Sequence, residues 1–209
     1  MPTEKHSWSP TRREVLATTA FVPLAALVSG AHSNAAAQTT SAPTATALSS
    51  AQKSTLEAFL DRLCPKDESG PGAVECGASS YIDRVLVGPN AGEKAAFMDG
   101  LAALDAAARA AKADSFAALK GEQQDAIITS FEDGTATGFA NARAFFNRAR
   151  RLMLEGMFSD PYYGGNKGFA GWDLLHYPGP KLAVAPEDQK MGTPPKPYRV
   201  SAWGNQNGH

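Results

Sequence analysis

The side chains best suited to chemistry are two cysteines and four histidines, in a chain of 209 residues. Neither Cys64 nor Cys76 stands in the C-x-x-C-H setting that attaches a haem, and no G-x-S-x-G elbow holds a nucleophilic serine. His176 adjoins Tyr177, and a lone histidine of this kind more often packs or hydrogen-bonds than acts as a base. These residues therefore predict neither a haem site nor a catalytic triad.

Glycine-rich and acidic segments also fall short of known ligand motifs. Residues 70–72 begin like a dinucleotide fingerprint without a leading strand, and residues 164–168 lack the spacing of a P-loop. The acidic pairs at 67–68 and 132–133 do not have the spacing of an EF-hand, so we interpret them as solvated carboxylates. We expect no catalytic, cofactor-binding or metal site in this chain. Its net charge of −1 argues against a nucleic-acid partner.

Residues 1–37 have the three parts of a bacterial export signal. Arg12 and Arg13 form the paired arginines that are typical of the Tat route. The apolar run that follows is shorter than the ~20 residues that a membrane span needs. Small residues from Ala35 to Ala37 then suit a signal peptidase. The sequence predicts Tat export to the periplasm and cleavage after Ala37, with a retained signal anchor as the alternative.

Export bears on the two cysteines, because free thiols seldom persist in an oxidising compartment. Eleven residues separate Cys64 from Cys76. A bridge between them would close this loop and stabilise the fold by ~2–3 kcal/mol on the loop-entropy model. We predict this internal bridge. Two buried free thiols, or one cysteine bonded to a partner chain, are the alternatives.

Helix signals dominate after a small and polar segment at 38–48, which we interpret as a flexible leader. Ser49 and Gln52 fit a capping box, and Pro65 ends the helix that it starts. Apolar residues at helical spacing and the absence of a strand pattern predict an all-α bundle of about five helices, in a domain spanning 49–158. The helices are expected at about 49–64, 81–86, 93–112, 121–133 and 138–158.

Residues 159–209 hold seven of the fourteen prolines and many glycines, which predicts a largely irregular tail. This tail also carries Trp172 and Trp203. A segment with large aromatic side chains and no core of its own is expected to wrap over the helical domain or over a partner. Just upstream, a basic run at 148–151 forms a solvated face or meets an acidic partner.

Two blocks at the start of the tail are specific enough to suggest a family. They read E-G-x-x-x-D-P-x-Y-G-G-N and G-W-x-x-x-x-Y-P-G. The matching residues are Glu155, Gly156, Asp160, Pro161, Tyr163, Gly164, Gly165, Asn166, Gly171, Trp172, Tyr177, Pro178 and Gly179. This pattern resembles the small-subunit (subunit 3) family of bacterial gluconate 2-dehydrogenases. Weaker matches extend the resemblance over about residues 50–185. The cysteine pair departs from the family pattern, so the resemblance does not imply the bridge.

The resemblance implies a subunit without a catalytic site of its own. Family members assemble with a large FAD-containing dehydrogenase, and a membrane-bound multihaem cytochrome c, carrying haem c, passes electrons on. The small subunit's Tat signal would carry the flavin subunit into the periplasm, where the complex associates with the inner membrane. The substrate would be a sugar, sugar acid or polyol that the large subunit selects.

We predict that the turn after the last helix docks on the flavin subunit. The predicted interface residues are Asp160, Pro161, Tyr162, Tyr163, Gly164, Gly165, Asn166, Trp172 and Tyr177. For Trp172 the alternative is that it covers this chain's own helices. Two other classes of function stay open. One is a stand-alone periplasmic sugar-binding protein or enzyme that uses the aromatic loop, and the other is an escort or structural protein without a redox partner.

Overall fold

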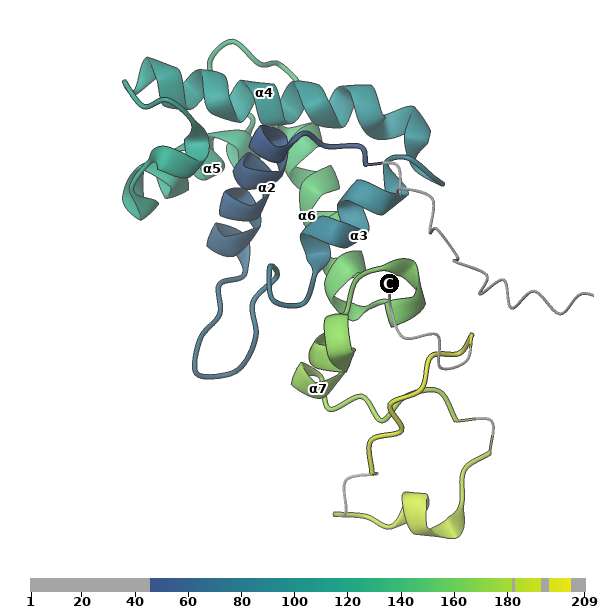
Figure 1. Ribbon diagram of the computed structural model, residues 1–209. Helices are drawn as coiled ribbons and strands as arrows, with labels where there is room; N and C mark the ends of the chain where they lie inside the picture. The colour runs from purple at the N-terminus through teal and green to yellow at the C-terminus, as the bar shows by residue number, and fades with distance from the viewer. Residues whose placement is uncertain (1–45, 182, 193–195, 204–209) are drawn as a thin grey trace, which may run out of the picture. The chain divides into compact units, whose positions relative to one another are not determined.

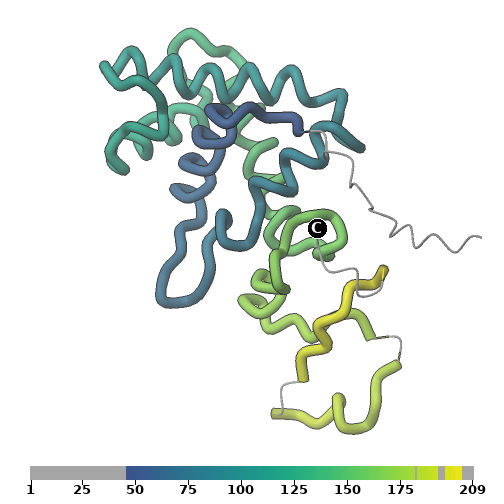
Figure 2. Tube along the Cα trace, in the orientation of Figure 1, coloured from purple at the N-terminus to yellow at the C-terminus, as the bar shows by residue number. Residues whose placement is uncertain are grey.

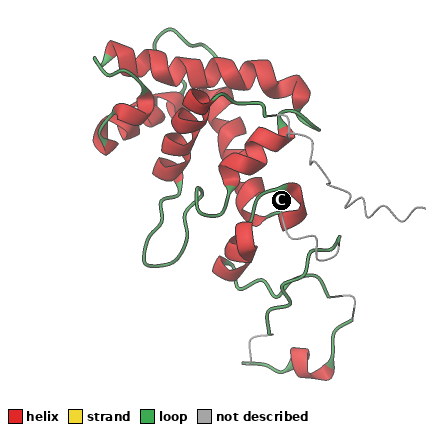
Figure 3. Cartoon of the chain, in the orientation of Figure 1, coloured by secondary structure: helices red, strands yellow, loops and turns green. Residues whose placement is uncertain are grey.

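Six α-helices and no β-strand occur in the part of the chain that the structure describes, so the all-α prediction is confirmed (Figures 1 and 3). The structure is a computed structural model and describes residues 46–181, 183–192 and 196–203. These residues belong to one unit, Pro43–His209. None of the described helices is long and apolar enough to cross a membrane. The predicted signal residues lie outside the described ranges: Arg12, Arg13, Ala35 and Ala37.

The helix ends follow from local sequence. Helix α2, Ser50–Leu63, begins with the predicted capping box, in which Ser49 and Gln52 exchange hydrogen bonds with each other's backbone N–H groups. Helix α5, Gly121–Asp133, ends at Gly134, whose φ of 71° is the left-handed conformation that glycine adopts at little cost. Two further helices lie between α2 and α5: α3, Ala78–Val85, and α4, Lys94–Ala110.

Helix α6, Ala142–Phe158, is the helix on which the core is built. It packs against α2, α3, α4 and α5. The ring of Phe145 lies 5.4 Å from that of Phe97 and 5.8 Å from that of Phe59, between centroids. Gly100 lets α4 approach closely, because a Cβ there would overlap the Phe145 ring. We expected α6 to begin near Gly138, but Gly138 has a φ of 79° and precedes the helix in a turn.

The described domain starts slightly before the predicted boundary at residue 49. The Asp83 carboxylate on α3 accepts hydrogen bonds from the backbone N–H groups of Ala47, at 2.7 Å, and Leu48, at 2.8 Å. Leu48 is buried. The last residues of the predicted flexible leader are therefore part of the folded domain.

The start of the tail is more regular than expected. Helix α7, Ala170–Leu174, follows two single-turn 3₁₀ helices at Pro161–Tyr163 and Lys167–Phe169. A third 3₁₀ turn spans Pro186–Gln189. Farther on, the chain doubles back so that the stretch around Tyr198 passes beside the segment that follows α7 (Figure 2). Glycine and proline are frequent in this tail, but its described residues still form several short helical turns.

The predicted disulfide is not present in the structure, where Cys64 and Cys76 are both free thiols. Cys76 is fully buried in the core, and this burial, with a smaller effect of the neighbouring Cys64, raises the pKa of its thiol to about 11. The loop is already closed by a hydrogen bond from the Ala73 N–H to the Cys64 carbonyl oxygen, at 2.9 Å. The prediction was based on the cell compartment and on sequence spacing, and neither determines whether two Sγ atoms meet.

Candidate functional site

Asp160 organises the turn that follows α6. Its Oδ1 accepts a hydrogen bond from the Tyr162 N–H at 2.9 Å and caps the 3₁₀ turn that starts at Pro161. Its Oδ2 accepts from the backbone N–H of Ala202, at 2.7 Å, near the far end of the tail. One carboxylate thus joins the beginning of the tail to its last described residues.

Two glycines then let the chain fold back against α6. Gly164 has a φ of 94°, which side chains with a Cβ rarely adopt. Gly165 needs its missing side chain for a different reason, since a Cβ there would overlap the backbone of Gly156 on α6. The close approach allows the Asn166 N–H to donate to the Gly156 carbonyl oxygen at 2.6 Å.

Asn166 ties the tail to the end of α6 through its side chain. It is completely buried, with a φ of 44° that asparagine tolerates better than most residues. Its Nδ2 donates to the carbonyl oxygen of Ser159 at 2.9 Å, and its Oδ1 accepts from the Gly171 N–H at 2.8 Å. These bonds satisfy backbone groups on both sides of the loop, so Asn166 acts inside the fold.

Trp172 lies inside the chain, as the alternative for this residue proposed, and not in an exposed interface position. Only 6% of its surface is exposed, and its indole N–H donates to the Phe158 carbonyl oxygen at 2.9 Å. Its ring packs at 5.2 Å from Phe169 and 5.0 Å from Tyr177, between centroids. Gly171 allows this packing, because a Cβ there would overlap the carbonyl oxygen of Met157. Trp172 therefore covers the chain's own helices.

Three predicted interface residues do present their rings to solvent. Tyr162, Tyr163 and Tyr177 are 39%, 43% and 43% exposed. The rings of Tyr162 and Tyr163 meet edge to face at 5.4 Å. Trp203 is not among the predicted interface residues. Its ring centroid lies 5.6 Å from that of Tyr162, and the residue is 60% exposed. Exposed aromatic rings held by a rigid turn are typical of protein interfaces.

A shallow pocket adjoins the buried tryptophan. Its volume is about 560 Å³. The lining residues are Phe158, Trp172, Leu175, His176, Tyr177 and Pro178. His176 has a φ of 53°, a strained conformation that is often found at functional positions. The pocket is mostly aromatic and apolar, and among its lining residues only His176 and Tyr177 carry strong polar groups.

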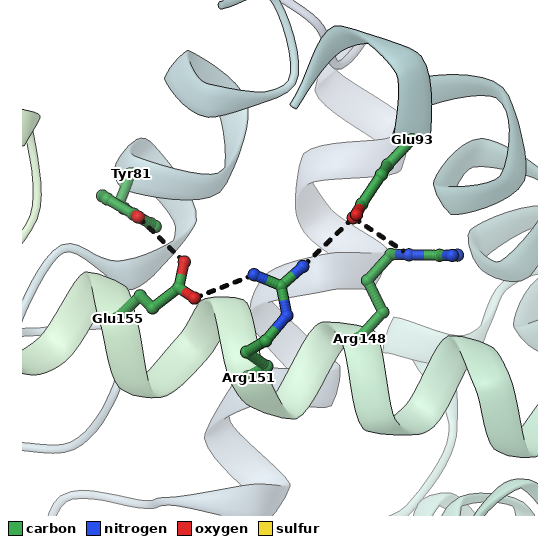
Figure 4. A network of polar contacts seen from close by, with 5 residues as sticks. All are labelled: Tyr81, Glu93, Arg148, Arg151 and Glu155. Atoms are coloured by element: carbon green, nitrogen blue, oxygen red, sulfur yellow. Dashed lines mark hydrogen bonds and ion pairs between the residues drawn. The ribbon is translucent and has the colours of Figure 1, made fainter. Parts of the chain in front are cut away.

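A chain of polar contacts joins α3, α6 and the turn before α4 (Figure 4). The Tyr81 hydroxyl donates to Glu155 at 2.9 Å, and Arg151 bonds Glu155 at 2.8 Å and Glu93 at 3.1 Å. Arg148 also reaches Glu93, at 3.0 Å. Burial and, second, the bond to Glu155 raise the pKa of Tyr81 to about 12. Arg148 and Arg151 of the basic run therefore form ion pairs with acidic residues of this chain itself.

Within the described ranges, no group of three or more histidine, cysteine, aspartate or glutamate side chains is arranged to hold a metal ion.

The comparisons with known proteins give one match. The sequence model of a protein family described as gluconate 2-dehydrogenase subunit 3 matches residues 50–179. This range begins at the first residue of α2 and ends with the Y-P-G block. No curated protein and no solved structure matches the chain.

Proposed function

The chain belongs to the gluconate 2-dehydrogenase subunit 3 family, and from this membership we propose that it is the non-catalytic small subunit of an FAD-dependent dehydrogenase complex. The family match carries the proposal, because it spans the helical domain and the start of the tail rather than a short motif. A protein described as one subunit of a dehydrogenase has partner subunits by definition.

The geometry supports a role in assembly. The buried part of the tail blocks, Gly165, Asn166 and Trp172, fastens the tail to α6. This attachment holds Tyr162 and Tyr163 in place at the surface, where aromatic rings lose little side-chain entropy on binding. Large aromatic anchors commonly carry most of the binding energy of an interface. We therefore assign the exposed rings, and not Trp172, to contact with the flavin subunit.

The redox cofactors in this proposal belong to the partners. FAD would be held by the large dehydrogenase subunit, and haem c by a membrane-bound multihaem cytochrome that takes the electrons. The contribution of this chain is to stabilise the flavin subunit. The oxidised substrate, a sugar, sugar acid or polyol, would bind in the large subunit.

Export of the flavin subunit is the second part of the proposal. A folded flavoprotein requires a route that accepts folded cargo, and Arg12 and Arg13 have the twin-arginine pattern of that route. Replacing both with lysine in the full chain should leave this chain and the flavin subunit in the cytoplasm. The measurement is flavin absorbance and immunodetection of both chains in periplasmic and cytoplasmic fractions. A flavin subunit that still reaches the periplasm in the double-lysine strain would refute the escort role.

A stand-alone sugar-binding protein is the alternative, and the aromatic pocket beside Trp172 is the observation that favours it. Carbohydrate sites combine an aromatic face with several polar groups, whereas this pocket offers few. Titration of the full-length chain with gluconate and glucose separates the two. The accessory-subunit proposal predicts no binding heat, and saturable binding by the isolated chain would favour the alternative.

A further inference from the structure

The last six residues that the structure describes, 198–203, lie beyond the family-matched range, which ends at residue 179. We call it the C-terminal strap. It returns to the turn that carries the exposed tyrosines, as the hydrogen bond between Ala202 and Asp160 shows. The strap therefore places residues from outside the family-matched range next to the proposed interface.

Several contacts attach the strap to the motif residues. The Tyr198 N–H donates to the Pro178 carbonyl oxygen at 2.6 Å, and Gly179 leaves room for the backbone of Tyr198, which a Cβ would overlap. Arg199 forms an ion pair with Asp173 on α7 at 2.6 Å. Ser201 is buried between these attachments. The strap thus has a defined position, although most of its bonds are close to solvent.

At the end of the strap, Trp203 lies against the Tyr162 ring, with 5.6 Å between centroids and 35° between ring planes. Trp203 is 60% exposed and Tyr162 is 39% exposed. A segment that sealed the tyrosines from solvent would bury both rings. Because both stay open, Trp203 extends the aromatic surface and does not close it.

Basic side chains border this surface. Arg84 donates to the Tyr162 carbonyl oxygen at 3.3 Å, and both Arg84 and Lys167 lie beside the turn at 164–165. Neither takes part in any ion pair among the described residues. The nearby carboxylate of Asp160 is engaged with two backbone N–H groups. Asp160 keeps its negative charge in these bonds, so the two cations outnumber it. A surface with an aromatic centre and more cations than anions at its edge is complementary to an apolar recess edged by carboxylates.

We propose that the C-terminal strap completes the docking surface for the flavin subunit and supplies Trp203 as an anchor beside Tyr162 and Tyr163. The inference rests on the proposed function. It adds that the flavin subunit offers an apolar recess with aspartate or glutamate at its edge. Since the strap lies outside the family-matched range, it determines which flavin subunit this chain selects, whereas the motif residues provide the common platform.

The test uses the tagged full-length chain co-expressed with an FAD-dependent dehydrogenase large subunit from the same organism. Trp203→Ala should weaken the complex at least ~10-fold, the loss that is typical for an interface anchor. Met191→Ala is the matched control, because Met191 is an apolar tail residue that is 99% exposed. The melting temperature of both isolated variants should equal that of the parent chain.

A charge reversal at the edge of the surface provides a second, independent test, with the association rate as its measurement. Lys167→Glu should slow association with the flavin subunit and reduce its dependence on salt, since rim charges act mainly on the association rate. Unchanged affinity in Trp203→Ala, or tighter binding, would overturn the strap proposal while the complex itself remains. If the parent chain forms no complex with the flavin subunit, the proposed function itself fails.

Discussion

Asn166 shows how much one residue of the tail blocks contributes to the fold. Its amide carries both a donor, to Ser159, and an acceptor, from Gly171, in a fully buried position. At neutral pH an aspartate of the same size is ionised and can only accept, whereas the amide offers a donor and an acceptor without charge. The residue is therefore fixed by hydrogen bonding within the chain rather than by a ligand or partner.

Asn166→Asp is a nearly isosteric test of this role. At pH 8 the ionised carboxylate would face the Ser159 carbonyl oxygen, and a buried uncompensated charge of this kind costs ~3 kcal/mol or more. Burial raises the folded-state pKa of such an aspartate, so stability should be regained as pH falls through that pKa and the acid becomes a donor. Urea unfolding at pH 8 and pH 4 measures the difference. Asn147→Asp, at an exposed position on α6, should show no such dependence.

The raised pKa of Tyr81 predicts that the stability of the fold depends on this residue at alkaline pH. Its pKa is raised from 10.0 to about 12 in the folded chain, so its contribution is present below pH 10 and is lost as pH rises toward 12. Tyr81→Phe should cost ~1–2 kcal/mol at pH 8, because the bond to the Glu155 carboxylate disappears. The variant should then lose less stability than the parent chain between pH 9 and pH 11. Tyr198→Phe, at an exposed position, is the control, and an equal pH dependence in Tyr81→Phe would contradict this account.

At the scale of elements, glycines bring α3, α6 and the tail together. A Cβ at Gly156 would lie 2.8 Å from the Ala78 Cα on α3. Gly165 and Gly171 let the tail backbone meet α6 directly. The glycines of the two tail blocks therefore allow close packing between backbones.

Gly171→Ala tests this junction. The added Cβ would overlap the Met157 carbonyl oxygen, which belongs to helix backbone and yields little, so we expect a loss of ~1–3 kcal/mol. The loss should be accompanied by a shift in tryptophan fluorescence, because Trp172 follows directly. Gly92→Ala is the control, since nothing lies within 4 Å of its Cβ position. A Gly171→Ala chain as stable as the control would contradict the close contact.

The helices were predictable because their signals are local. Ser49, Pro65 and Gly134 act within a few residues of the ends that they define. The short helix α7 and the burial of Trp172 were not predictable in this way, since both depend on where the tail meets α6. The sequence showed which segment is rich in aromatic residues, but not which of these residues face solvent.

Trp203 and Arg84 were missed for the same reason. Each lies far in sequence from Tyr162, and only the return of the strap and the packing of α3 bring them beside it. No local pattern signals such a contact. The neighbours of Tyr162 that are distant in sequence are therefore visible only in the folded chain.

At the scale of the whole molecule, stability and assembly should separate between two aromatic positions. Trp172→Ala removes a core side chain and should cost ~3–5 kcal/mol in the isolated chain. Tyr162→Ala, at a 39% exposed position, should cost less than ~1 kcal/mol yet weaken the complex with the flavin subunit. Denaturant unfolding and co-purification measure the two effects. If Trp172→Ala leaves the stability unchanged, or Tyr162→Ala leaves the complex unchanged, the assignment of buried and docking residues is wrong.

The central claim is that this chain carries no flavin and binds a subunit that does. Native mass spectrometry of the full-length chain, alone and co-expressed with an FAD-dependent dehydrogenase large subunit from the same organism, tests it most directly. The account predicts a chain of unliganded mass when expressed alone, and a stable complex of both chains containing one FAD when they are expressed together. A flavin-loaded isolated chain, or two chains that never appear in one complex, would contradict it.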